Sequence, residues 1–378
     1  MESFIAYNPT SLHFGKDILN DLGKTVAKYG NRVLLVYGRH SIKQNGLYEL
    51  VTDKLESTGA TVFEFAGIKS NPVIEDVDAA AAVGRKHNTD VIVAVGGGSV
   101  IDSAKMISVT IPYEGKAWDF FLKKATPATA IPVIAVLTLA ATGSEMNPFA
   151  VISNHEARRK GSYTSPLMFP KHSFLDPQFT ISVPYDYTAY GIADLIAHCL
   201  EAYFGKGEAT LSDRFVFSII KEALENGPAL LKDLTNYDLR ARIMFAATMA
   251  LNGLTMQGRA SGDWGVHSIG HILSLLYDIP HGASLTIVYP AWLKLLKERL
   301  ADRIAWLGHN IFNTDDVDLT IERLESFFKL IDCPVRLNEL VPQPNIDEIV
   351  NVMILNKAAT FVHKLDQDDY REVVQLMY

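Results

Sequence analysis

The chain is poor in the features that would assign it to several common protein classes. Its 378 residues include only two cysteines, Cys199 and Cys333, which excludes a disulfide framework and favours a reducing compartment. The longest nearly unbroken apolar run, residues 131–141, is too short to cross a bilayer. The first fifteen residues contain neither a basic leader nor an apolar stretch of signal-peptide length. These absences predict a soluble cytoplasmic protein with no membrane partner.

Positive charge is also scarce. Lysine and arginine together number 35 against 43 aspartates and glutamates, and the formal net charge is −8. No segment concentrates the basic residues, so a nucleic-acid partner is not expected. Three familiar site motifs are missing as well: GxGxxG of ordinary Rossmann folds, the full GxxxxGK[ST] pattern of Walker A loops, and HExxH of zinc hydrolases.

Short apolar runs alternate with amphipathic segments through the first half of the chain. The runs resemble strands that are buried on both faces of a parallel sheet. They are residues 32–38, 61–67, 90–98 and 131–138. The segments between them, such as 45–59 and 73–88, are long enough for crossover helices. This alternation predicts an α/β domain with a doubly wound, mostly parallel sheet over residues 1–183.

The second half has a different pattern. After residue 184, apolar residues recur at helical spacing, with glycine and proline between the segments, and strand-like runs almost disappear. We therefore expect an all-α domain over residues 184–378.

A glycine-rich turn, GGGSVIDSAK, follows the strand predicted at residues 90–98 and opens a helix. Glycines let a ligand approach the backbone, and a helix N-terminus offers N–H groups and a partial positive charge. These properties suit a dinucleotide pyrophosphate, although a plain strand-to-helix turn, capped by a polar side chain, is the alternative. The residues concerned are Gly96, Gly97, Gly98, Ser99 and Asp102.

A second turn, VYGRHSIKQNG, follows the first predicted strand, where dinucleotide-binding folds meet the adenosine ribose. NAD sites commonly place an acidic residue there for the 2′-hydroxyl. This turn instead has small, polar or basic residues, namely Gly38, Arg39, His40, Ser41 and Lys43. We expect NADP(H), with NAD(H) less favoured, unless Arg39 and Lys43 are only solvated surface charges.

Histidine and aspartate gather at helical spacing in the second half. Asp194 and His198 are four residues apart, as are His267 and His271, and this spacing places both members of a pair on one helix face. His281 follows a proline and is expected at a helix boundary. A single buried histidine is more often a core or capping group, but several ionisable groups in apolar helices are costly to bury unless a cation compensates them. Such a set suits divalent iron or zinc.

With these motifs placed, the chain resembles the iron-containing (group III) alcohol dehydrogenases, and among them the NADP-dependent butanol dehydrogenases. The resemblance covers nearly the whole length. It rests on FGKD, VYGRHSIKQNG, GGGSVIDSAK, LTLAATGSEMN, YGIADLIAHCLEAYF, HSIGHILSLLYDIPHG and IVYPAW. It implies a homodimeric oxidoreductase that interconverts primary alcohols and aldehydes by hydride transfer, with NADP(H) and Fe²⁺ or Zn²⁺.

The resemblance also implies roles for individual residues. The metal ligands of the family match Asp194, His198, His267 and His281. His271 then lies near the substrate as the implied catalytic residue, where an imidazole can relay a proton. The implied coenzyme contacts are the residues of the two turns, together with Asn71, Thr138, Thr142, Asn147 and Lys160.

The chain departs from the family pattern at two places. The butanol dehydrogenase branch reads YGGGS where this chain has YGRHS, so Arg39 and His40 are bulkier and either grip or crowd a 2′-phosphate. The branch also carries a glutamate before the middle histidine, where this chain has Gly270, which changes the surroundings of His271.

Two other functions are compatible with such a scaffold. A metal- and nucleotide-dependent lyase or synthase of the dehydroquinate-synthase type would leave the nicotinamide unchanged after turnover. A non-catalytic binding protein would keep the fold without the chemistry. The Asp-His-His-His set and its YGIAD context disfavour the first, and the presence of all four expected ligands disfavours the second.

Overall fold

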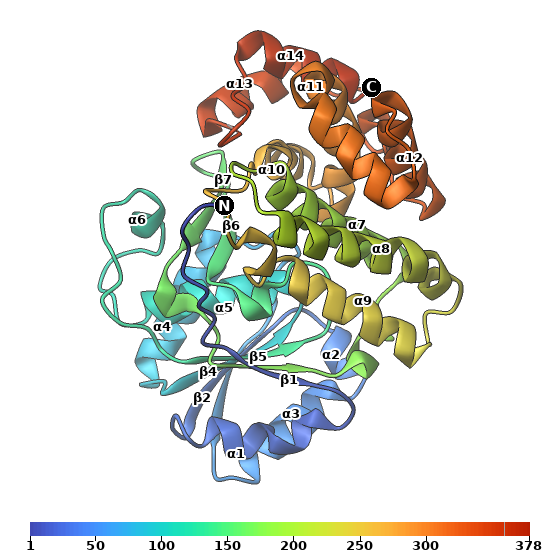
Figure 1. Ribbon diagram of the computed structural model, residues 1–378. Helices are drawn as coiled ribbons and strands as arrows, with labels where there is room; N and C mark the ends of the chain where they lie inside the picture. The colour runs from blue at the N-terminus through green and yellow to red at the C-terminus, as the bar shows by residue number, and fades with distance from the viewer. Residues whose placement is uncertain (359) are drawn as a thin grey trace. The chain divides into compact units, whose positions relative to one another are not determined.

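The chain forms two compact units in the computed structural model, which describes residues 1–358 and 360–378 (Figure 1). The α/β unit comprises residues 7–183 and 235–244. The helical unit comprises residues 1–6, 184–234 and 245–378. Residues 1–6 and 235–244 therefore belong to the unit opposite to the one expected. Apart from these two segments, we propose the domain boundaries 1–183 and 184–378.

A six-stranded, wholly parallel sheet forms the centre of the α/β unit, with the strand order β1-β8-β5-β4-β2-β3. The strands are β1 Ser11–Phe14, β2 Arg32–Tyr37, β3 Thr61–Phe65, β4 Val91–Gly96, β5 Val133–Leu137 and β8 His172–Leu175. Four of them, β2 to β5, lie where the apolar runs predict strands. The expected doubly wound α/β fold is thus confirmed, and β1 and β8 add an edge that the sequence did not indicate.

Helices cover both faces of this sheet, as Figure 1 shows, with α1 and α3 on one face and α4 and α5 on the other. Side chains of the strands alternate between two apolar cores; Leu35 and Val93, for example, pack on the α1/α3 side, and Leu34 and Ile92 on the α4/α5 side. The helices are α1 Leu22–Val26, α2 Ser41–Gln44, α3 Leu47–Glu56, α4 Ile74–Lys86, α5 Gly98–Thr110 and α6 Trp118–Phe121.

An antiparallel hairpin, β6 Phe149–Asn154 and β7 Arg159–Thr164, completes the α/β unit. Ser153 of β6 forms a backbone bridge with Val73, just before α4. The hairpin therefore carries its second strand toward the loop that precedes α4.

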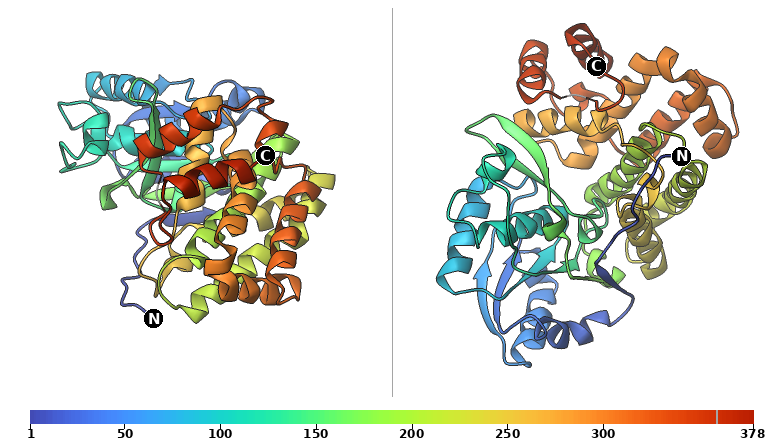
Figure 2. Two further views of the ribbon diagram at one scale, coloured as in Figure 1. Left: turned by 90° about the horizontal axis from the view of Figure 1, so that it is seen from above. Right: turned by 60° about the vertical axis from the view of Figure 1, so that its left-hand side comes forward.

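The helical unit contains the remaining helices, as expected for the second half. They are α7 Tyr185–Tyr203, α8 Thr210–Lys232, α9 Tyr237–Ala250, α10 Gly265–Tyr277, α11 His281–Phe312, α12 Val317–Leu330, α13 Ile346–Asn356 and α14 Gln367–Leu376. The start of α9 belongs to the α/β unit. The orange α11 and the redder α12 run side by side (Figure 2). None of the helices formed by the described residues has both the length and the apolar character that crossing a bilayer requires.

A buried ion cluster ties α8 to α11. Asp213 of α8 pairs with Arg259 and with Arg303 of α11, whose Nη1 lies 2.9 Å from Asp213 Oδ2. The Arg303 guanidinium lies 3.6 Å above the centre of the Tyr203 ring and donates to the Tyr203 carbonyl oxygen. Burial by itself raises the pKa of Asp213, but hydrogen bonds from the two arginines outweigh it and hold that pKa below its ordinary value.

Replacing Asp213 by asparagine should lower the free energy of unfolding by about 3 to 5 kcal/mol at neutral pH, because two arginines lose their buried partner. Asp318→Asn, in an exposed pair with Lys297, should cost about 1 kcal/mol or less.

The lowered pKa of Asp213 means that its contribution to the free energy of unfolding is present above the unfolded-state pKa and is lost in acid. The difference between wild type and Asp213→Asn should therefore shrink below about pH 4, as measured by denaturant titration. If Asp213→Asn and Asp318→Asn lowered the free energy of unfolding equally at pH 7, this account would be contradicted.

Candidate functional site

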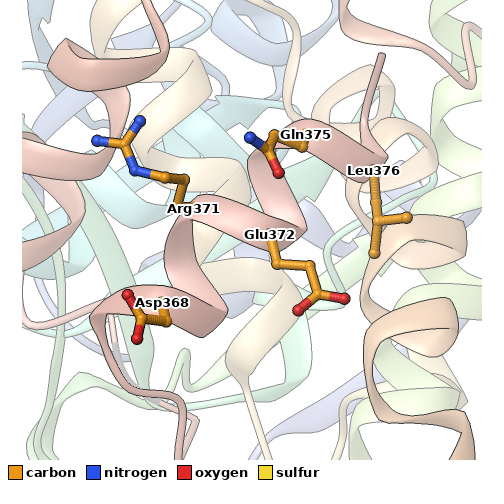
Figure 3. A pocket seen from close by; sticks show the side chains of 5 residues that line it. All are labelled: Asp368, Arg371, Glu372, Gln375 and Leu376. Atoms are coloured by element: carbon orange, nitrogen blue, oxygen red, sulfur yellow. The ribbon is translucent and has the colours of Figure 1, made fainter.

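One surface pocket lies apart from the residues that the sequence singled out. It is lined by residues of α14 alone, and Figure 3 shows their side chains: Asp368, Arg371, Glu372, Gln375 and Leu376. Arg371 already pairs with Asp347 of α13 at 2.7 Å. The candidate site lies instead on the helices that carry the histidines.

Three imidazoles approach a single oxygen atom of Asp194. The distance from Asp194 Oδ1 to Nε2 is 3.5 Å for His198, 3.7 Å for His267 and 3.7 Å for His281. Ligand atoms of Asp194, His267 and His281 all lie within 4.8 Å of one another, and His198 joins them through the same carboxylate oxygen. The structure thus brings together the four residues that the family resemblance implies as metal ligands.

Local helix geometry accounts for this convergence. Asp194 and His198 occupy one face of α7, and His267 lies in the first turn of α10. His281 is the first residue of α11, in agreement with the boundary predicted from the preceding proline. His271, one turn after His267, is half-buried, and its ring centre lies 5.4 Å from that of His281.

The protonation states at the cluster are set by burial and by the shared carboxylate. Burial alone would raise the pKa of Asp194, but the surrounding histidines lower it well below its ordinary value. Burial lowers the pKa of His198 to about 4. Burial also acts to lower the pKa of His267, yet Asp194 and Glu201 outweigh it and raise that pKa to about 9. An ionised aspartate and a neutral His198 are ready to bind a cation, whereas His267 has to release a proton first.

The cluster fits a divalent cation better than it fits a hydrogen-bonded network. Among the residues that the structure describes, Asp194 Oδ1 and His267 Nε2 are buried without a hydrogen-bond partner. Separations of 3.5 to 3.7 Å are too long for hydrogen bonds. They are close to the roughly 3.4 Å between two donors of a tetrahedral ion whose ligand distances are about 2.0 to 2.1 Å.

Glu201 is a site residue that our sequence analysis missed. Its Oε1 accepts hydrogen bonds from the His267 ring Nδ1 at 3.0 Å and from the His267 backbone N–H at 2.9 Å. Its side chain is 1% exposed. A sequence pattern pointing to Glu201 was available, because Asp194, His198 and Glu201 are four and three residues apart, as on a single helix face.

The glycine-rich turn of the α/β unit has the predicted strand-turn-helix form. β4 ends at Gly96, Gly97 caps α5, and Gly98 is its first residue. A Cβ atom on Gly98 would overlap the Thr142 side chain, so this glycine lets the 138–144 loop approach the start of α5. The hydroxyl of Ser99 donates to the Ser70 carbonyl oxygen at 2.5 Å.

Asp102 and Asn147 are held by protein groups. Asp102 accepts from the Ser144 hydroxyl at 2.5 Å and from the Val151 backbone N–H at 2.8 Å. The fully buried Lys105, missed in our sequence analysis, donates to Ser144, to Asn147 Oδ1 and to a backbone carbonyl. Burial lowers the pKa of Lys105 to about 8. These bonds fix the 138–151 segment against α5.

The other predicted coenzyme contacts lie at the same edge of the sheet. Lys160 of β7 donates to Asn71 Oδ1 at 2.8 Å, although the two residues are 89 positions apart. The Thr138 backbone N–H donates to the Gly96 carbonyl oxygen, which places the start of the 138–144 loop beside the glycine-rich turn. The turn after β2 leaves Arg39, His40 and the following serine exposed.

Lys43, by contrast, has partners that the sequence did not indicate. Its Nζ lies 4.3 Å from the centre of the Tyr48 ring and 4.0 Å from Glu64 Oε2. Glu64 also accepts from the hydroxyls of Tyr37 and Tyr48, at 2.5 and 2.6 Å. A carboxylate on β3 and two phenol rings therefore offset the charge of Lys43. No spacing rule links a lysine of one turn to an acid on another strand.

Comparison with known proteins matches both halves of the chain. The model of the family described as "Iron-containing alcohol dehydrogenase" matches residues 9–177. The model described as "Fe-containing alcohol dehydrogenase family, C-terminal" matches residues 188–377.

Individual relatives agree with these matches. The chain is 41% identical to the probable NADH-dependent butanol dehydrogenase 2 of Bacillus subtilis, over 99% of each protein. It is 34% identical to the NADPH-dependent aldehyde reductase YqhD of Escherichia coli, over 90% of this chain and 89% of that protein. The crystal structure of NADH-dependent butanol dehydrogenase A from Thermotoga maritima superposes with a TM-score of 0.96, at 36% identity, over 100% of this chain and 99% of that one. The chain belongs to the iron-containing alcohol dehydrogenase family.

Proposed function

We propose that this enzyme is a metal-dependent, NADP(H)-using oxidoreductase that interconverts primary alcohols and aldehydes. The observation that carries the proposal is the convergence of three histidine Nε2 atoms on Asp194 Oδ1. The names of the relatives, butanol dehydrogenase and aldehyde reductase, support the substrate class. A cytoplasmic homodimer that acts on a small alcohol or aldehyde remains our prediction from the family resemblance.

Asp194, His198, His267 and His281 would hold the cation, and the two glycine-containing turns would hold the coenzyme. A bound Fe²⁺ or Zn²⁺ supplies Lewis acidity toward a carbonyl oxygen, and a bound nicotinamide carries the hydride. The chain's own contribution is orientation, because one aspartate and three imidazoles would fix the position of the ion. The N-terminus of α5 supplies backbone N–H groups for a pyrophosphate.

His271 is proposed to move the proton that accompanies hydride transfer. It is half-buried one helical turn after His267, and it stands apart from the atoms that meet at Asp194. Either ring nitrogen of an imidazole exchanges a proton near neutral pH, so His271 can pass one between solvent and the alcohol oxygen.

Preference for NADP(H) over NAD(H) is the finer part of the proposal. The turn after β2 contains no acid, and Arg39 and His40 are exposed on it. Because Glu64 and Tyr48 already engage Lys43, we assign the grip on a 2′-phosphate to Arg39. The names of the relatives include both NADH- and NADPH-dependent enzymes.

Close packing of α11 against α7 supports the ligand role of His281. A Cβ atom on Gly282 would overlap the backbone carbonyl oxygen of Tyr190 in α7. Only glycine lets the start of α11 approach α7 so closely. That approach carries His281, the adjacent residue, to 3.7 Å from Asp194 Oδ1.

The overall function can be tested by following NADPH absorbance with butanal as the substrate. Protein is assayed as purified, after chelation, and after addition of Fe²⁺ or Zn²⁺. We expect oxidation of NADPH that is lost on chelation and restored by one of the two ions. An enzyme that consumes no NADPH in any of these states would contradict the proposal and favour a lyase or a binding protein.

The ligand set is checked with His267→Ala. This variant should lose turnover in the same assay, and it should lose its bound metal as well. His309→Ala, on the exposed end of α11, serves as the control and should retain both. Unchanged turnover in His267→Ala would remove His267 from the ligand set.

Gly282→Ala should weaken metal binding by at least about tenfold, because the added methyl group pushes α11 away from the Tyr190 backbone. Gly308→Ala is a matched control. A Cβ atom at position 308 would overlap Thr320. This substitution therefore also crowds α11, but at a position far along the chain from the proposed ligands. Chelator competition with Zn²⁺ measures both affinities. A similar loss in both variants would mean that general destabilisation, rather than the position of His281, accounts for the effect.

The coenzyme assignment predicts that Arg39→Ala weakens NADPH binding about tenfold, equivalent to roughly 1.4 kcal/mol, and changes NADH binding less than about twofold. Lys43→Met should have the smaller effect on NADPH, because Glu64 already offsets the charge of Lys43. Coenzyme fluorescence titration gives the dissociation constants. A wild-type protein that binds NADH more tightly than NADPH would contradict the preference.

A further inference from the structure

The contact between Glu201 and His267 is the feature of the candidate site that the four-ligand description leaves unexplained. Glu201 lies two helical turns after Asp194, on the same face of α7. Its side chain is buried. Burying a carboxylate costs free energy, because the group loses much of its hydration. The hydrogen bonds of Glu201 must therefore offset this cost of burial. Their donor is His267, a proposed metal ligand on another helix.

Glu201 holds His267 at two points. Its Oε1 accepts from the backbone N–H of His267, in the first turn of α10, where intrahelical acceptors are missing. The same oxygen accepts from Nδ1 of the ring. The first bond fixes the start of α10 relative to α7, and the second fixes the rotation of the imidazole.

The ring contact also determines which nitrogen carries the proton. A carboxylate only accepts, so Nδ1 bears the hydrogen and the lone pair of neutral His267 lies on Nε2. Nε2 is the atom that lies 3.7 Å from Asp194 Oδ1, and it is buried without a hydrogen-bond partner among the described residues. The lone pair therefore faces the point at which the other donors meet.

We propose that Glu201 is a positioning residue of the metal centre, which selects the Nδ1–H form of His267 and aims Nε2 at the ion. This inference rests on the proposed metal site and deepens it. Carboxylates that orient metal-bound histidines commonly change metal affinity by about 10- to 100-fold when they are removed. Glu201 does not touch the substrate or the ion in this account, so its effect passes through His267.

The test compares Glu201→Gln with Glu325→Gln in otherwise intact protein. Glu325 is a second buried carboxylate of the helical unit, but Lys294, Lys329 and Arg336 surround it instead of a proposed ligand. Zn²⁺ affinity is measured by chelator competition at a temperature where circular dichroism shows both variants to be folded. We expect Glu201→Gln to bind Zn²⁺ about 10- to 100-fold more weakly than wild type, and Glu325→Gln to stay within about twofold.

A spectroscopic measurement separates positioning from loss of stability. Co²⁺ in place of the native ion reports ligand geometry through its visible absorption bands, which a merely structural role of Glu201 would leave unchanged. We expect the bands to shift in Glu201→Gln and to match wild type in Glu325→Gln. If Glu201→Gln fails to fold, Glu201→Asp takes its place, since its shorter side chain keeps the charge but withdraws from Nδ1.

The outcomes distinguish this inference from the function on which it rests. Wild-type protein that binds metal, together with a Glu201→Gln variant of equal affinity and unchanged Co²⁺ spectrum, overturns the role of Glu201 alone. Wild-type protein that binds neither Zn²⁺ nor Co²⁺ overturns the proposed metal site, and the role of Glu201 with it.

Discussion

Burial of one carboxylate oxygen among three imidazole nitrogens is the constraint on which the helical unit depends. Asp194 and His198 come from α7, His267 from α10 and His281 from α11, so three helices have to meet within a few ångströms. Buried ionisable groups without full hydrogen bonding cost stability. A fold that keeps such a cluster gives up stability in the empty state, and a cation compensates all the groups at once.

The surrounding helices show how that arrangement is maintained. Gly282 permits contact between the start of α11 and the backbone of α7, and Glu201 bonds the start of α10 to the same helix. Farther along α7 and α11, the cluster of Asp213, Arg259 and Arg303 joins α8 to α11 beside Tyr203. The charges of this cluster pair with one another, whereas, within the described part of the chain, Asp194 Oδ1 and His267 Nε2 are buried without a hydrogen-bond partner.

Apolar runs and helical periodicity were sufficient to predict most of the fold. Helical spacing paired Asp194 with His198 and His267 with His271, whereas the set of four that meets in the structure, with His281 in place of His271, came from the family resemblance. The edge strands β1 and β8 escaped prediction because each has only four residues, and β1 is only partly buried. The hairpin strand β7, RKGSYT, escaped because it is polar. Contacts such as Lys160 with Asn71, or Lys43 with Glu64, join segments that only the folded sheet brings together. Glu201 was within reach of the spacing argument, but a lone glutamate on a helix gives no sign that a histidine on another helix will meet it.

Exposure of Arg39 and His40 has a consequence for how this enzyme class can diversify. Both side chains lie outside the two apolar cores of the α/β unit, so exchanging them disturbs little packing. The helices of the proposed ligands have less freedom, because Glu201 bonds His267 and because Gly282 brings the start of α11 against the backbone of α7. Under the proposed role of Arg39, coenzyme choice can drift through substitutions on the surface while the proposed metal centre stays fixed. That asymmetry is in keeping with relatives, each matched over at least 88% of this chain, whose names differ between NADH and NADPH but refer to butanol or aldehyde chemistry.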